Sequence, residues 1–167
     1  MAGKAGPDWH WSVLLVLAVF GMQLRLLCNL FDGMVAIEGG FKTKAGEIFN
    51  ELPDRFSDAF IFIGAAYSLP DFPWARELGW GAAVLAVITA YVRALGASMG
   101  AGQIFLGPMA KPQRMATMTV ACLAAALAPV WTPLSRLIPV ALAVVVAGCL
   151  VTIVRRCRCI AQEMESK

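Results

Sequence analysis

Acidic residues are concentrated in one short part of this chain. Six of its eleven Asp and Glu residues fall between positions 32 and 58, namely Asp32, Glu38, Glu47, Glu51, Asp54 and Asp58. Carboxylates so close together repel one another unless some are protonated or a cation binds them. Oxygen ligands favour hard ions such as Mg²⁺ or Mn²⁺, which neutralise phosphates during phosphoryl transfer. The segment is therefore a candidate site for metal-assisted chemistry on a phosphate.

The spacing of the polar residues predicts two helix faces. One series, i, i+4, i+7, i+11, lies along a single face of a helix and consists of Glu47, Glu51, Asp54 and Asp58. A second series, i, i+4, i+7, ends the preceding apolar run and consists of Arg25, Asn29 and Asp32. A solvated acidic loop at a helix N-terminus is the alternative. It explains one or two acids well and a four-residue stripe poorly.

The composition of the chain indicates that these helix faces belong to a membrane protein. Of the 167 residues, 59% are hydrophobic and only 15% are charged, against roughly 45–50% and 25% in soluble domains. The first apolar run begins at Trp9 and lacks the basic n-region and cleavage site of a signal peptide. We expect one transmembrane domain over 1–167, with its active-site segment at 25–58 and no nucleic-acid partner.

The fold class that follows is all-α, a polytopic transmembrane helix bundle. About five segments have the length and apolarity of a span: 10–31, 56–73, 78–98, 113–131 and 134–154. With five spans, ten Lys and Arg residues lie on one side and only Lys4, Arg76 and Arg136 lie on the other. The positive side is cytosolic, so the loop predicted over 32–55 and the C-terminus face the cytosol.

The segment resembles the CDP-alcohol phosphotransferase family, whose pattern is D-x-x-D-G-x-x-A-R-x8-G-x-x-x-D-x-x-x-D. This chain has the same spacing throughout: Asn29-x-x-Asp32-Gly33-x-x-Ala36-Ile37, eight residues, then Gly46-x-x-x-Asn50-x-x-x-Asp54. Three identities depart, at Asn29, Ile37 and Asn50. A bacterial subset of the family is similar in these departures and also carries the equivalents of Arg25, Met34, Glu51, Ser57 and Asp58.

The resemblance implies a reaction and a set of roles. An acceptor hydroxyl attacks the pyrophosphate of a CDP-alcohol, for example CDP-diacylglycerol, and CMP leaves. Mg²⁺ or Mn²⁺ is held by Asp32 and Asp54, with Asn29, Asn50, Glu51 and Asp58 as further ligands. Asp54 holds the general-base position, and Asp58 is the second candidate for it. Gly33, Ala36 and Gly46 are expected to contact the nucleotide.

A basic cluster is expected on the same side of the membrane. Arg93 ends the third predicted span, and Lys111 and Arg114 open the fourth. Family members that use a phosphorylated acceptor, such as glycerol 3-phosphate, place basic residues in this region. Arg suits bidentate phosphate binding, but positive-inside topology and lipid headgroup contacts explain the same residues. Arg25 either binds phosphate or neutralises the acidic stripe.

The resemblance also implies an integral membrane protein of the bacterial inner membrane, a homodimer, with its active site facing the cytoplasm. Family members usually have six spans, whereas only about 31 residues precede Asp32 here, which is room for one span. Two other functions stay open at this point. One is a non-catalytic CDP-lipid-binding or partner protein on the same scaffold. The other is a small cation transporter, which would need its carboxylates near the bilayer midplane.

Overall fold

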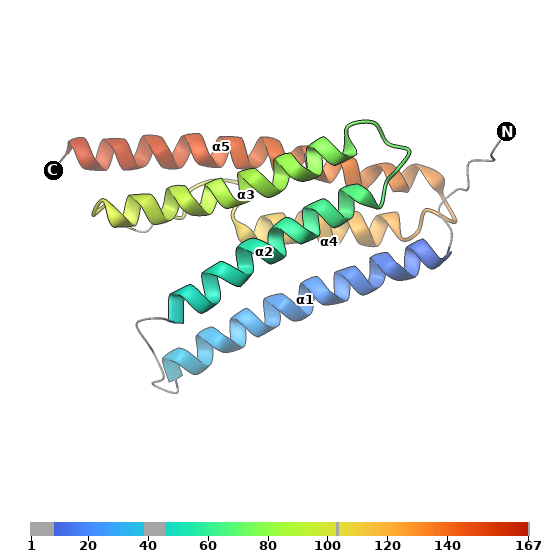
Figure 1. The fold of residues 1–167 in the computed structure, drawn as a ribbon, viewed down its shortest axis with the longest axis horizontal. Helices are drawn as coiled ribbons and strands as arrows, with labels where there is room; N and C mark the ends of the chain where they lie inside the picture. The colour runs from blue at the N-terminus through green and yellow to red at the C-terminus, as the bar shows by residue number, and fades with distance from the viewer. Residues whose placement is uncertain (1–8, 39–45, 103, 167) are drawn as a thin grey trace. The chain divides into compact units, whose positions relative to one another are not determined.

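The computed structural model describes residues 9–38, 46–102 and 104–166. Within these ranges the chain forms helices and no strand, so the all-α prediction is confirmed (Figure 1). In chain order the elements are α1 (Trp9–Glu38), α2 (Gly46–Tyr67), α3 (Ala75–Ser98), α4 (Lys111–Ala125), the 3₁₀ helix η1 (Thr132–Arg136) and α5 (Leu137–Glu165).

Three stretches of the described residues are long and apolar enough to cross a membrane: Trp9–Val35, Ala75–Ser98 and Thr132–Glu165. They contain three of the five predicted spans. The other two predicted spans fall largely on α2 and α4. Helix α2 carries four acidic residues and one Arg, and the 15 residues of α4 extend about 22 Å, less than the roughly 30 Å of a hydrocarbon core. A bundle of five spans therefore stays a prediction.

The predicted loop over 32–55 is wrong for most of its length. Helix α1 continues to Glu38, and α2 already begins at Gly46. The apolar run continues past Asp32 through Met34 and Val35, and a single Gly inside a helix costs only about 1 kcal/mol relative to Ala. Gly33 thus lies on a helix rather than in a flexible connection, and Asp32 lies on the same helix as Arg25 and Asn29, as their spacing predicts.

The helices group into two compact units. The first contains the described parts of 1–56 and 119–137, and the second contains the described parts of 57–118 and 138–167. In the first unit, α1 contacts the end of α4. The side-chain amide of Gln23 on α1 donates a hydrogen bond of 2.9 Å to the hydroxyl of Thr119 on α4. Among the described side chains of α1, the buried apolar ones are Leu15, Val19 and Met22. They are spaced four and three residues apart, as one helix face requires.

In the second unit, α3 and α5 run side by side (Figure 1). Helix α5 presents one continuous buried stripe, at intervals of three and four residues: Ile138, Leu142, Val145, Cys149, Thr152, Arg156 and Ile160. Small residues allow the helices to approach closely. A side chain at Gly79 would collide with Ala66 and with the carbonyl oxygen of Phe62 on α2. The stripe changes from apolar to polar at Thr152, which brings polar side chains into the unit's interior.

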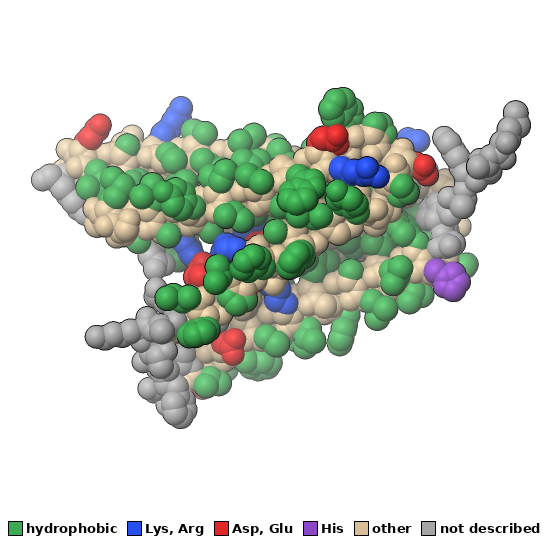
Figure 2. Space-filling view, in the orientation of Figure 1, with side chains coloured by type: hydrophobic (Ala, Val, Ile, Leu, Met, Phe, Trp, Pro, Cys, Tyr) green, Lys and Arg blue, Asp and Glu red, His purple; other side chains and the backbone are tan. Residues whose placement is uncertain are grey.

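The outer surface of the helices is apolar. Large hydrophobic side chains are exposed along α1, α3 and α5, including Phe20, Leu24, Val84 and Val144. Figure 2 shows hydrophobic side chains over most of the visible face and few charged ones. Soluble proteins rarely expose so much contiguous apolar surface, so this surface is compatible with a membrane protein.

Candidate active site

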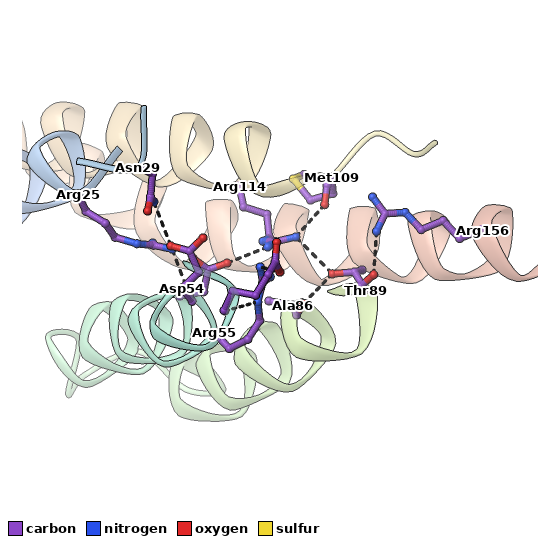
Figure 3. A network of polar contacts seen from close by, with 11 residues as sticks. Arg25, Asn29, Asp54, Arg55, Ala86, Thr89, Met109, Arg114 and Arg156 are labelled. Atoms are coloured by element: carbon purple, nitrogen blue, oxygen red, sulfur yellow. Dashed lines mark hydrogen bonds and ion pairs between the residues drawn. The ribbon is translucent and has the colours of Figure 1, made fainter. Parts of the chain in front are cut away.

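Asp54 is the centre of a polar cluster in the first unit. The guanidinium of Arg25 donates to the Asp54 carboxylate, with Nη2 2.9 Å from Oδ1, and to its backbone carbonyl at 3.1 Å. The amide Nδ2 of Asn29 donates to the same Oδ1 at 3.0 Å. Arg25 and Asn29 lie one turn apart on α1, and Figure 3 shows both pointing at Asp54. Two donors from one helix thereby fix the carboxylate of another.

This cluster is shielded from solvent. The side chains of Arg25 and Asp54 are 15% and 10% exposed, so their attraction is screened less than that of a surface pair. Of the two roles left open for Arg25, phosphate binding and neutralisation of the acidic stripe, the geometry shows an ion pair with the stripe.

Glu51 and Arg55 form a second, more superficial pair. They lie one turn apart on α2, with Arg55 Nη2 2.6 Å from Glu51 Oε2 and Nε 3.1 Å from the Glu51 carbonyl oxygen. The Glu51 side chain is 45% exposed. The Arg55 side chain is 17% exposed. An i, i+4 pair with one exposed partner is expected to contribute about 0.3–0.5 kcal/mol, and it joins only neighbouring turns of α2.

The remaining residues predicted in this unit lie along the same two helices. Asp32 is exposed on α1, one turn beyond Asn29, and a Cβ at Gly33 would meet nothing within 4 Å. Gly46 is the first residue of α2. The side chains of Ala36, Glu47 and Asn50 lie outside the described part of the structure. The predicted acidic stripe therefore has a helical backbone from Glu47 onward, but its first side chain is not placed.

The described side chains do not by themselves form a divalent-cation site. Among them, no three His, Cys, Asp or Glu residues come together as possible ligands. Asp54 instead receives a guanidinium and an amide, and a guanidinium repels a metal ion. Individual oxygen donors of the right chemistry are present at Asp32, Asn29 and Glu51. The metal ligand set implied by the resemblance thus stays a prediction.

Asp58 lies one turn beyond Asp54 on α2 and belongs to the second unit. Its Oδ2 is 2.7 Å from Nη2 of Arg114, and the two side chains are 1% and 2% exposed. The other terminal nitrogen of Arg114 donates to the carbonyl oxygen of Met109 at 3.1 Å and to the hydroxyl of Thr89 at 3.3 Å. Arg114, predicted to bind an acceptor phosphate, is thus placed in an internal ion pair.

Arg156 is a further residue of this network that no sequence motif singles out. In the sequence it is one of the ten basic residues on the positive side of the predicted bundle. Its Nη1 donates to the carbonyl oxygen of Thr89 at 2.7 Å (Figure 3). Its Nε donates to the carbonyl oxygen of Leu106 at 3.0 Å. It is only 4% exposed. The available signal was its register, because Arg156 continues the i, i+3, i+4 stripe of apolar residues on the last helix.

The other two predicted phosphate-binding residues also lie in the second unit. Arg93 is half-buried at the end of α3, with its guanidinium carbon 5.3 Å from the centre of the Phe105 ring. Lys111 is half-buried at the first position of α4. Arg93, Arg114 and Arg156 therefore belong to one polar region of this unit, whereas Arg25 belongs to the first unit.

No protein-family model, curated protein or solved structure matches the chain. The likeness to the CDP-alcohol phosphotransferases thus depends on the residues and spacing of the segment 25–58.

Proposed function

We propose that this protein transfers a phosphatidyl or related phospho-alcohol group from a CDP-alcohol, such as CDP-diacylglycerol, to an acceptor alcohol and releases CMP. The proposal includes the finer membrane arrangement: five spans, a bacterial inner-membrane location, a cytoplasmic active site and a homodimer. Its first support is the uninterrupted spacing of the motif from Asn29 to Asp54.

One contact carries the proposal further than the spacing alone. Asn29 opens the motif and Asp54 closes it, 25 residues later, and their side chains are joined by a hydrogen bond of 3.0 Å. Arg25, which precedes the motif by one turn, bonds the same carboxylate. A motif whose ends meet in space can act as one site.

The chain's own residues suit a proton transfer coupled to substitution at phosphorus. The carboxylate of Asp54 takes the proton of the acceptor hydroxyl, whose oxygen forms a bond to the β-phosphorus of the donor. The bond between that phosphorus and the bridging oxygen breaks, and CMP leaves with the oxygen and its electron pair. Arg25 and Asn29 hold the base in one orientation, which a positioned general base requires.

Asp58 is the second candidate for the base, although its ion pair with Arg114 buries it more completely. Dependence of the reaction on Mg²⁺ or Mn²⁺ is measured by adding either ion or a chelator to the assay. A phosphorylated acceptor would meet Arg93 and Lys111 most readily, since both are half-buried rather than enclosed. Arg114 would contribute only by exchanging the carboxylate of Asp58 for phosphate.

The test is CMP release by the purified protein in detergent. The assay supplies CDP-diacylglycerol with Mg²⁺ or Mn²⁺ and, in parallel, glycerol 3-phosphate, inositol phosphate, serine or glycerol. We expect release that needs one acceptor and stops with a chelator. Asp54→Asn should lower it by about 10²–10⁴-fold, the usual contribution of a general base. Asp71→Asn, an exposed carboxylate between α2 and α3, is the matched control and should keep full activity.

A non-catalytic CDP-lipid-binding protein is the second candidate. The observation that favours it is the substitution of Asn29 and Asn50 for motif aspartates, together with a described cluster in which Asp54 faces a guanidinium. Saturable binding of CDP-diacylglycerol without CMP release, over all acceptors and both metals, would support this second function and exclude the first for that donor.

A further inference from the structure

The connection between α3 and α4 is attached to α5 by three side chains. The hydroxyl of Thr152 accepts a hydrogen bond from Met109 N at 3.1 Å, Arg156 Nε donates to Leu106 O at 3.0 Å, and the Glu163 carboxylate accepts from Gly102 N at 3.3 Å. Their spacing of four and seven residues places all three on one face of α5. Backbone groups of the connection, which no helix ladder pairs, thus find their partners on α5.

Thr89 is the point at which two guanidinium groups meet on α3. Its carbonyl oxygen accepts from Arg156 at 2.7 Å, and its hydroxyl oxygen accepts from Arg114 at 3.3 Å. The hydroxyl donates its own proton to the carbonyl oxygen of Ala86 at 2.7 Å. Because that proton is committed, the hydroxyl can only accept from Arg114, which sets the direction of the bond.

Arg114 is held from the other side by the connection. Met109 gives its carbonyl oxygen to Arg114 and its N–H to Thr152. Two acceptors of the Arg114 guanidinium, on Thr89 and Met109, are thus themselves fixed through side chains of α5. The third acceptor is the carboxylate of Asp58. A continuous chain of contacts runs from Arg156 through Thr89 to Arg114 (Figure 3). From Arg114 it continues to Asp58.

Packing alone does not explain an arginine at position 156, because its charge is buried. It occupies a position in a buried stripe whose neighbours are Cys149, Thr152 and Ile160. Within the described residues it donates to two carbonyl oxygens and to no carboxylate. Burying a cation without a counter-anion is unfavourable, and an apolar residue would fill the same place without that cost. The fork of the guanidinium reaches two carbonyls on different segments at once, which an apolar or a singly donating side chain cannot do.

We propose that Arg156 is a positioning residue for the transfer reaction. It bridges Thr89 and Leu106. It thereby fixes one acceptor of Arg114 directly, at Thr89, and holds the connection that carries the other, Met109. Through Arg114 it orients the carboxylate of Asp58. This inference rests on the proposed function, and it gives Arg156 no contact with substrate.

The test compares Arg156→Gln, Arg156→Lys and the control Arg155→Gln, which removes an exposed charge from the adjacent position of α5. We expect Arg156→Gln to lower kcat on the order of tenfold to hundredfold, the effect of a misplaced catalytic group, with KM for the donor nearly unchanged. Arg156→Lys, which keeps the charge but places its donors on a single nitrogen, should recover part of the loss. Arg155→Gln should retain the natural kcat.

A double-variant comparison separates positioning from a general loss of stability. If Arg156 acts through Arg114, then adding Arg156→Gln to Arg114→Lys should change kcat by less than about twofold, because coupled residues are not additive. Should Arg114→Lys fail to fold, Thr89→Val with Thr89→Ser as its conservative partner takes its place. Additive losses, or an equal loss in Arg155→Gln, would overturn the proposal.

Hydrogen–deuterium exchange keeps the test independent of turnover. Arg156→Gln should exchange faster than the natural chain over 104–110, and Arg155→Gln should not. If the natural chain releases no CMP from any donor, the proposed function fails. The exchange measurement still tests whether Arg156 holds the connection over 104–110. Unchanged exchange over 104–110 overturns the chain of contacts even if CMP release is established.

Discussion

Asp58 and Arg114 form an ion pair that is almost completely withdrawn from solvent. The carboxylate oxygen and the guanidinium nitrogen are 2.7 Å apart, and the two residues are 56 positions apart in the chain. One comes from α2 and the other from the first turn of α4. Both charges lose their hydration in this position, so each depends on the other to remain buried.

We therefore predict that Arg114→Met destabilises the protein by about 3–5 kcal/mol, because it leaves the Asp58 charge buried and uncompensated. The double variant Arg114→Met with Asp58→Leu should lose clearly less than the sum of the two single losses. Unfolding in detergent measures each change, with Arg158→Met as the control for removal of an exposed charge. Strict additivity in this cycle would contradict the pair.

The helical elements and the polar faces could be predicted from the sequence because they depend on short-range periodicity. The stripe that includes Glu51, Asp54 and Asp58 lies on α2, as its spacing indicates. The same reasoning misplaced the ends of the helices around 32–38 and 46–55. The Gly-rich sequence around Gly33 favours a loop, whereas one glycine is tolerated within a continuing apolar helix.

The partners of the arginines could not be predicted in the same way. Arg25 and Arg114 were open between phosphate binding and other uses, and a choice requires knowing which carboxylate each one reaches. Those distances arise from tertiary packing between segments 29 and 56 residues apart. Arg156 was missed for a related reason, since a basic residue near a helix end is normally explained by topology. Only its place in the buried stripe of α5 distinguishes it from the exposed Arg155.

Helix contact in the second unit yields a prediction at Gly79. A Cβ there would stand 2.9 Å from the carbonyl oxygen of Phe62 and would collide with the Cβ of Ala66. Gly79→Ala should therefore destabilise the protein by about 1–3 kcal/mol, the usual cost of overpacking. Gly81→Ala is the control on the same helix, because its nearest neighbour is Val146 at an ordinary 3.7 Å. Equal melting temperatures for the two variants would argue against the close approach of α2 and α3.

The connection before α4 yields a prediction at Gly107. Its φ of 129° is unfavourable for any residue with a Cβ, and such a Cβ would also press against the side chain of Thr152. We expect Gly107→Ala to cost about 1–3 kcal/mol for the backbone alone. Thr152→Ser removes the methyl group but keeps the hydroxyl that binds Met109, so it should recover part of the loss. Gly102→Ala, with open space around it, should unfold at the temperature of the natural chain.

Arg25 and Arg55 allow a matched comparison of two arginine–carboxylate pairs in the first unit. Arg25 joins α1 to α2 through Asp54, and both side chains are shielded, whereas Arg55 binds Glu51 on its own helix and Glu51 is 45% exposed. Arg25→Met should lower the free energy of unfolding by about 1.5–3 kcal/mol, the value of hydrogen bonds to a charged group, and Arg55→Met by only about 0.3–0.5 kcal/mol. If the protein is a transferase, Arg25→Met should also lose most CMP release, because Asp54 is no longer oriented, while Arg55→Met keeps it. Similar losses of stability in both variants would show that the Arg25 pair is no more than a surface contact.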